Sequence, residues 1–165
     1  MLQYRDAIID DLPRIVEIYN SIVAGRMVTA DTDPVTVESR IAWFNAHDPK
    51  FRPLWMVMDG SQNIGWVSYQ WFYGRPAYNG TAELSIYLDE KIRGKGYGEK
   101  ILLYAMNSCE QLKIKTLLGY IFAHNTPSLN LFRKLGFTNW GHFPRIAVLD
   151  GVERDLIIVG KRINN

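Results

Sequence analysis

The chain has a single cysteine, Cys109, which leaves no partner for an internal disulfide. It also lacks a long apolar run: no stretch reaches the roughly 20 residues of a membrane-spanning helix, and no basic-then-apolar leader opens the sequence. A length of 165 residues suits one domain with a substantial core. We therefore expect a single domain over residues 1–165 in a soluble cytoplasmic protein that makes no contact with a membrane.

Net charge is small and histidine is scarce. The formal charge of +2 is too low to indicate binding of nucleic acid. The three histidines, His47, His124 and His142, are scattered and match no metal-ligand spacing. We therefore expect neither a nucleic-acid partner nor a bound metal.

The stretch from Thr81 to Met106 combines a strand, a basic glycine-rich loop and a helix. Its first residues alternate between apolar and polar, which predicts a strand with one buried face. The apolar face carries Ala82, Leu84, Ile86 and Leu88, and the other face carries Thr81, Glu83, Ser85 and Tyr87. After the loop, apolar residues recur with helical spacing, so a helix should follow directly.

The loop from Arg93 to Gly98 contains three glycines and two basic residues. Glycines let backbone N–H groups approach a ligand, and the N-terminus of a following helix attracts anions. The spacing Gly-x-Gly-x-Gly differs from the dinucleotide fingerprint, and no Gly-Lys-Ser/Thr of a nucleoside-triphosphate loop follows. The loop is either an ordinary turn with solvated charges or, as we predict, a site for the phosphate groups of another ligand.

The rest of the chain alternates between predicted strands and helices, without repeats or linkers. Cap and stop residues predict one helix ending near Gly25 and a second from Pro34 to about Ala46, with Val37, Ile41 and Phe44 inward. We expect strands at 2–7, 54–58, 64–72, 81–88, 116–123, 137–143, 146–149 and 156–159, and a short helix at 129–135. The pattern predicts an α+β fold with a mixed, mainly antiparallel sheet and one parallel βαβ passage.

The motif Arg93-x-x-Gly96-x-Gly98 matches the acetyl-CoA signature Gln/Arg-x-x-Gly-x-Gly/Ala, and here the sequence resembles the GNAT N-acetyltransferases. The resemblance extends over almost the whole chain and is strongest to the phosphinothricin acetyltransferase branch. The matching blocks are Ile18-Tyr19-Asn20, Asp33-Pro34-Val35, Arg40-Ile41-Ala42-Trp43-Phe44, Ile64-Gly65-Trp66-Val67-Ser68, Arg75-Pro76-Ala77-Tyr78, Thr81-Ala82-Glu83 and a late block from Asn125 to Phe137. It implies the GNAT fold, in which a central pair of parallel strands splays apart.

The resemblance implies that acetyl-CoA is the cosubstrate. Its pyrophosphate would lie on the loop made by Arg93, Gly94, Lys95, Gly96, Tyr97 and Gly98. Its pantetheine arm would pair with the strand residues Ile86, Tyr87 and Leu88, and Asn125 and Lys134 of the late block would complete the site. A general rule agrees, because ligands bind where strand connections diverge, outside the carboxyl ends of parallel strands.

Acetyl transfer to an amine requires that the ammonium ion first lose its proton, which a nearby carboxylate of raised pKa can accept. From the pattern alone, Glu83 is either such a base or a solvated strand carboxylate. The resemblance assigns it the role of general base, with a backbone N–H near Tyr87 as the oxyanion donor. Many GNAT enzymes have a tyrosine, thought to protonate the leaving thiolate, where this chain has Phe132. Water, another residue or unassisted departure all stay open.

The predicted acceptor site involves the loop before this strand. Arg75 is either a surface arginine or a partner for a substrate carboxylate or phosphinate. Relatives often carry a second arginine where this chain has Tyr73. We expect Arg75, Tyr73 and Ser85 to bind the acceptor, with the loop from Met27 to Asp31 as another candidate wall.

The resemblance therefore implies an acetyl-CoA-dependent N-acetyltransferase that acetylates the α-amino group of a small amino-acid-like molecule by direct attack. Phosphinothricin, methionine sulfone and methionine sulfoximine are the substrates it suggests, and a homodimer is the assembly. Two alternatives stay open: a GNAT enzyme for another amine, and a domain that binds acetyl-CoA without turnover.

Overall fold

The computed structural model describes residues 1–164 of the chain. Its centre is a seven-stranded sheet with the order β1-β2-β3-β4-β5-β7-β6. The strands are β1 Leu2–Asp6, β2 Leu54–Asp59, β3 Gln62–Trp71, β4 Thr81–Leu88, β5 Thr116–Phe122, β6 Thr138–Leu149 and β7 Val152–Arg162. Within these described residues β4 and β5 form the single parallel pair, which confirms the predicted mixed, mainly antiparallel sheet.

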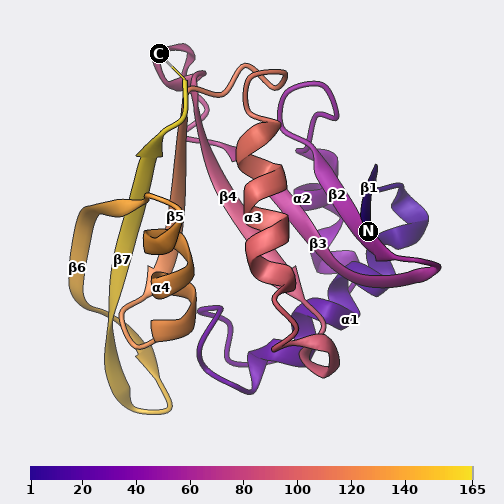
Figure 1. Cartoon of the computed structure of the whole chain (residues 1–165). Coiled ribbons are helices and arrows are strands. Elements are labelled where there is room, and N and C mark those ends of the chain that lie inside the picture. The colour runs from indigo at the N-terminus through magenta and orange to yellow at the C-terminus, as the bar shows by residue number, and fades with distance from the viewer. Residues whose placement is uncertain (165) are drawn as a thin grey trace.

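Helices cover both faces of the sheet (Figure 1). Helices α3 (Tyr97–Asn107) and α4 (Thr126–Lys134) lie on one face, and α1 (Leu12–Val23) and α2 (Ile41–Asn45) lie on the other. Short 3₁₀ turns complete the elements: η1 Ile9–Asp11, η2 Glu38–Arg40, η3 Pro76–Tyr78 and η4 Glu90–Ile92.

Each face has its own apolar core. The α3 side buries Ile101, Leu102 and Ala105 against Val67, Leu84 and Leu117. The α1 side buries Leu12, Ile15, Val16 and Ile18 against Met56 and Trp66. Because full burial of an aliphatic side chain contributes about 1.5–3 kcal/mol, these two layers fix the central strands from both sides.

The parallel pair β4–β5 stays together over a short distance only. Residues Thr81 to Glu83 pair with Thr116 to Leu118, whereas β4 continues to Leu88 and β5 to Phe122. The two strands therefore diverge beyond Glu83, and the backbone edge of β4 that faces β5 is left without a strand partner. This is the predicted splay.

Strand β4 divides its side chains as the alternation predicts. Ala82 and Leu84 are buried in the α3 core. Glu83, Ser85 and Tyr87 point to the opposite face, where they line a cavity beside α1. Strand β4 thus presents polar side chains to a cavity while Ala82 and Leu84 stay buried.

The predicted helix from Pro34 to Ala46 is wrong in its first half. The structure has only η2 and the short α2 there. The side chain of Asn20 accepts from the Val35 N–H at 2.8 Å and donates to the Val35 carbonyl at 3.0 Å. The Val35 carbonyl, which would accept from the Ser39 N–H in the predicted helix, is thus bonded to Asn20, and the Ser39 N–H donates instead to the hydroxyl of Thr36 at 3.1 Å. Ile41, expected to face inward, is 42% exposed.

The two late strands predicted at 137–143 and 146–149 are one strand, β6. The pairing of β6 with β7 shifts register between Phe143 and Ala147, so the chain bulges there without leaving the sheet. The bulge contains Pro144, which cannot donate to a ladder, and Arg145, which has a φ of 51°. Strand β7 is also longer than the predicted 156–159.

The buried side chain of Arg52 stabilises the segment that leads into β4. Arg52 is 1% exposed, and its guanidinium donates to the carbonyl of Asn79 at 2.6 Å. It also lies 4.0 Å from the centre of the Trp71 ring. These contacts tie the end of β3 and the start of β4 together, just before Glu83.

Candidate active site

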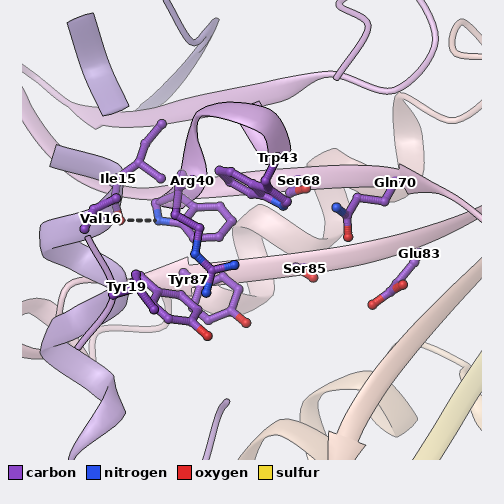
Figure 2. Close-up of a pocket in the computed structure, with 12 residues that line it drawn as sticks. Ile15, Val16, Tyr19, Arg40, Trp43, Ser68, Gln70, Glu83, Ser85 and Tyr87 are labelled. Carbon is purple, nitrogen blue, oxygen red and sulfur yellow. Dashed lines mark hydrogen bonds between the residues drawn. The ribbon is translucent and has the colours of Figure 1, made fainter. Parts of the chain in front are cut away.

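The face of β3 and β4 that is turned toward α1 and α2 forms the floor of a cavity of about 230 Å³ (Figure 2). Cross-strand neighbours line it in rows: Trp66 opposite Tyr87, Ser68 opposite Ser85, and Gln70 opposite Glu83. Residues Ile15, Val16, Tyr19, Val35, Arg40 and Trp43 form the walls. We call this space the β3–β4 cavity.

Glu83 lies at one end of the β3–β4 cavity (Figure 2). Its carboxylate accepts no hydrogen bond from a residue in 1–164, and burial raises its pKa above the ordinary value for a glutamate. A desolvated carboxylate without a cationic partner binds a proton more tightly than a solvated one. Glu83 is therefore suited to accept a proton from a group bound in the cavity.

Arg40 lies at the other end, beside Tyr19 and Tyr87 (Figure 2). Its guanidinium pairs with Asp31 at 2.9 Å and lies 4.9 Å from the centre of the Tyr19 ring. Sequence reasoning placed Arg40 in a family block but gave it no role in the site. The available signal was a cation directly before the apolar run from Ile41 to Phe44.

A second cavity of about 400 Å³ lies where β4 and β5 diverge, and we call it the splay cavity. Ile86 and Leu88 of β4 line it, together with Gly119 and Tyr120 of β5. The predicted loop and late-block residues Arg93, Gly94, Gly96, Gly98 and Asn125 line it as well. Ser85 and Tyr87 line both cavities, so the two spaces meet at these residues.

The glycine loop presents a helix N-terminus to the splay cavity. Gly94 and Gly96 have φ angles of 84° and 74°, which residues other than glycine rarely adopt. Gly96 is the N-cap of α3, and no side chain caps this helix. The first N–H groups of α3 are thus available to an anion, as the sequence motif predicts.

Three residues predicted for this site do not line the splay cavity with their side chains. Lys95 is exposed. The hydroxyl of Tyr97 donates to Asp59 at 2.6 Å, and the ammonium group of Lys134 pairs with Glu99 at 2.7 Å. Tyr97 nevertheless begins α3, so its backbone N–H belongs to the helix N-terminus.

Asn125 connects the splay cavity to two elements. Its side chain accepts from the Ser128 N–H at 3.3 Å and so caps α4, which begins earlier than predicted. Its amide also donates to the Met27 carbonyl at 3.2 Å, in the loop after α1. Phe132, the other late-block residue of interest, lines the same cavity and is 7% exposed.

The loop before β4 lies outside both cavities. Neither Arg75 nor Tyr73 lines them, whereas Ser85 lines both. Tyr73 is 78% exposed, has a φ of 55°, and packs against Phe72 and Tyr78. The structure therefore brings Ser85 together with Glu83 and leaves the other two predicted acceptor contacts at the surface.

Within residues 1–164, no group of three or more His, Cys, Asp and Glu residues is arranged to hold a metal ion. Of the helices the structure describes, none is long and apolar enough to cross a bilayer.

A splayed parallel pair, with a glycine loop at a helix N-terminus beside it, matches the arrangement that the resemblance to GNAT acetyltransferases implies. The chain belongs to this family, since residues 2–138 match the acetyltransferase (GNAT) domain. This match confirms the predicted family and fold.

Two relatives show which acetyltransferases within this family the chain is similar to. YwnH of Bacillus subtilis (strain 168), provisionally named a phosphinothricin acetyltransferase, is 52% identical over 155 residues, or 93% of this chain and 94% of that protein. An L-methionine sulfoximine/L-methionine sulfone acetyltransferase of Pseudomonas paraeruginosa (strain DSM 24068 / PA7) is 31% identical over 153 residues, which span 92% of this chain and 89% of that protein.

Solved structures agree with these relatives. A provisionally named phosphinothricin N-acetyltransferase superposes with a TM-score of 0.97 and 50% identity, covering 100% of both chains. A phosphinothricin acetyltransferase of Sinorhizobium meliloti, solved in complex with acetyl-CoA, has a TM-score of 0.90 and 27% identity, covering 99% of this chain and 89% of that one. The protein is an acetyl-CoA-dependent N-acetyltransferase, as predicted.

Proposed function

We propose that the protein transfers the acetyl group of acetyl-CoA to the α-amino group of a small amino-acid-like acceptor, of the phosphinothricin, methionine sulfone or methionine sulfoximine type. The observation that carries this proposal is Glu83, a desolvated carboxylate of raised pKa in a cavity that adjoins the splay cavity. The names of the relatives support the acceptor class.

The proposed reaction is a direct attack. Glu83 takes a proton from the acceptor ammonium group, directly or through water, and the freed amine nitrogen bonds to the carbonyl carbon of the thioester. The carbonyl oxygen becomes an oxyanion that accepts a hydrogen bond from a backbone N–H of splayed β4 near Tyr87. Collapse of the tetrahedral intermediate breaks the carbon–sulfur bond, and the CoA thiolate leaves with the electron pair and takes up the second proton that the amine nitrogen gives up, directly or through water, as the amide forms.

The cosubstrate would occupy the splay cavity. Its pyrophosphate would bind the N–H groups of the loop and of the α3 N-terminus, at Gly94, Gly96, Tyr97 and Gly98, with positive charge from Arg93 and Lys95. Its pantetheine arm would pair with the open edge of β4 at Ile86, Tyr87 and Leu88. Asn125, and Lys134 at the end of α4, would border the cofactor on the far side.

The acceptor would occupy the β3–β4 cavity, with Ser85 at the junction of the two cavities. Arg75 and Tyr73 would act from the loop before β4. Their exposure suits them to contact the distal end of an acceptor, such as a phosphinate or sulfone group, rather than the reacting amine.

We also propose that residues 1–165 form one domain, that the protein is cytoplasmic and that it forms a homodimer. The single sheet supports the first proposal. The free, buried thiol of Cys109 and the use of acetyl-CoA suit a reducing intracellular compartment. Exposed apolar side chains on the edge strand β6, namely Trp140, Phe143, Ile146 and Val148, would suit a dimer interface.

A thiol-release assay tests the acceptor class. We expect CoA release from acetyl-CoA with methionine sulfone, methionine sulfoximine and phosphinothricin, at kcat/KM values well above those for spermidine, an aminoglycoside or a peptide N-terminus. Reactions without an acceptor provide the control for thioester hydrolysis. A higher kcat/KM for one of the other amines would show that the proposed acceptor class is wrong.

A further inference from the structure

The β3–β4 cavity carries one positive and one negative side chain among the described residues that line it, Arg40 and Glu83. They lie toward opposite ends, with Ser85 between them on the floor (Figure 2). The remaining lining residues are apolar or carry neutral polar groups. A ligand that fills this space therefore meets a carboxylate at one end and a guanidinium at the other.

Contacts outside the cavity fix the orientation of Arg40. One terminal nitrogen, Nη2, donates to Asp31 at 2.9 Å, and the hydroxyl of Tyr19 donates to the same carboxylate oxygen. The guanidinium also packs near the Tyr19 ring, 4.9 Å from its centre. Asp31 does not line the cavity, so it binds the guanidinium from outside the cavity.

The other donors of Arg40 have no partner within residues 1–164. Nε and Nη1 make no hydrogen bond there, although the side chain is only 28% exposed. A guanidinium presents its N–H groups in a rigid fork that matches a carboxylate. Asp31 thus holds Arg40 through Nη2, and the N–H groups of Nε and Nη1 remain able to bind an anion.

The charges in the cavity distinguish between acceptor classes. A zwitterionic amino acid offers its ammonium group to Glu83, directly or through water, and its carboxylate to the remaining N–H groups of Arg40. A polyamine or another simple amine has no carboxylate and would leave the Nε and Nη1 donors of Arg40 without a partner in the substrate or in residues 1–164, although Asp31 still pairs with Nη2. Arg75 cannot fill this role from inside the cavity, because it does not line it.

We infer that Arg40 binds the carboxylate of the acceptor and so restricts the enzyme to α-amino acids. This inference rests on the proposed function and adds a specificity-determining residue to it. Asp31 and Tyr19 position Arg40, and the carboxylate, once bound, places the adjacent amine near Ser85, where the two cavities meet.

A kinetic comparison tests this role with methionine sulfone and its primary amide, which differ in the carboxylate alone. We expect Arg40→Gln to lower kcat/KM for the acid by about 10- to 150-fold, the loss typical of a hydrogen bond to a charged group. The amide should lose less than about threefold on the same scale. Arg40→Lys keeps the charge without the fork and should fall between the wild type and Arg40→Gln.

Matched variants separate binding from architecture. Asp31→Asn should weaken use of the acid moderately, because it loosens the orientation of Arg40 without removing its charge. Arg133→Gln, an exposed arginine of α4 outside both cavities, should leave the acid-to-amide ratio unchanged. Equal losses for acid and amide in Arg40→Gln and Arg40→Lys would show that Arg40 has only a structural role, and would overturn the inference.

A binding measurement without turnover distinguishes this inference from the proposed function. Trp43 and Trp66 line the cavity, so intrinsic fluorescence can report its occupation. Methylsulfonylbutanoate, an acid without the amine, should change the fluorescence of the wild type but not of Arg40→Gln, and its amide should not bind. That result without acetylation of any amino acid would refute the proposed acceptor and support the Arg40 site. Absence of binding to the wild type would overturn the Arg40 site.

Discussion

At the scale of single residues, the proton affinity of Glu83 is set by its surroundings. Burial raises its pKa, so the folded chain binds this proton more tightly than the unfolded chain does. The ionised carboxylate therefore costs stability at neutral pH, and this cost disappears as the pH falls through the raised pKa. A group that is unfavourable for the fold and central to the site is typical of catalysis.

Glu83→Gln tests this residue. We expect kcat to fall by about 10²- to 10⁴-fold, the usual contribution of a general base, while the Kd for acetyl-CoA stays close to that of the wild type. The acid limb of the wild-type pH–rate profile should lie above the ordinary glutamate pKa and vanish in the variant. The Tm at neutral pH should not fall, because the variant removes a desolvated charge.

Glu153→Gln is the matched control, since Glu153 is exposed on β7. It should retain the wild-type profile. Full activity in Glu83→Gln, or an acid limb that survives the substitution, would transfer the role of base to another group.

At the scale of elements, the loop between β4 and α3 combines a local backbone requirement with binding. Gly96 and Gly60 both have left-handed φ angles, 74° and 60°, and no atom would contact an added Cβ at either position. They differ in place: Gly96 caps α3 at the splay cavity, and Gly60 lies in the β2–β3 turn. The same substitution at the two sites therefore separates backbone strain from cofactor binding.

We expect Gly96→Ala and Gly60→Ala each to lose about 1–2 kcal/mol of stability, because L-residues are strained in this conformation. In a chain of this size that loss lowers the Tm by roughly 2–4 °C per kcal/mol. Only Gly96→Ala should also weaken acetyl-CoA binding, by about tenfold, because the added methyl group would lie beside the phosphate-binding N–H groups of α3. Titration calorimetry measures the affinity, and equal affinities in the two variants would remove Gly96 from the phosphate site.

Some helices and strands follow from local sequence patterns, and others depend on contacts with distant residues. The alternation in β4 and the glycine loop before a helix are local patterns, and the structure confirms them. The helix predicted from Pro34 failed because the side chain of Asn20, on another element, bonds the backbone of Val35. No local pattern in residues 34–46 reveals that bond.

At the scale of the whole molecule, the open edge of β6 is the main unexplained surface. Ile146 and Val148 on this strand are 58% and 60% exposed. An edge strand with apolar side chains is prone to pair with another chain unless something covers it. A second copy of the chain would cover it in the proposed homodimer.

Sedimentation velocity tests the assembly with the double variant Ile146→Asp and Val148→Asp. The wild type should sediment as a dimer at micromolar concentration, and the variant should shift toward the monomer because two charges would be buried at the interface. Leu103→Asp, at an exposed apolar position on α3, is the control and should stay dimeric. A monomeric wild type, or a double variant that stays dimeric, would refute this interface.

Local patterns are enough to predict the features that depend on neighbouring residues: the alternating strand that carries Glu83, the glycine loop before α3, most of the strands and helices, and through the motifs the family. Which side chains share a cavity depends on contacts between distant segments. The tertiary structure brought Arg40, from a segment expected to be an ordinary helix, to the same cavity as Glu83, and left Arg75 and Tyr73 at the surface. The physical reason is that the cavity lies between the sheet and α1 and α2, so its lining depends on long-range packing and on bonds such as that from Asn20, which no local pattern encodes.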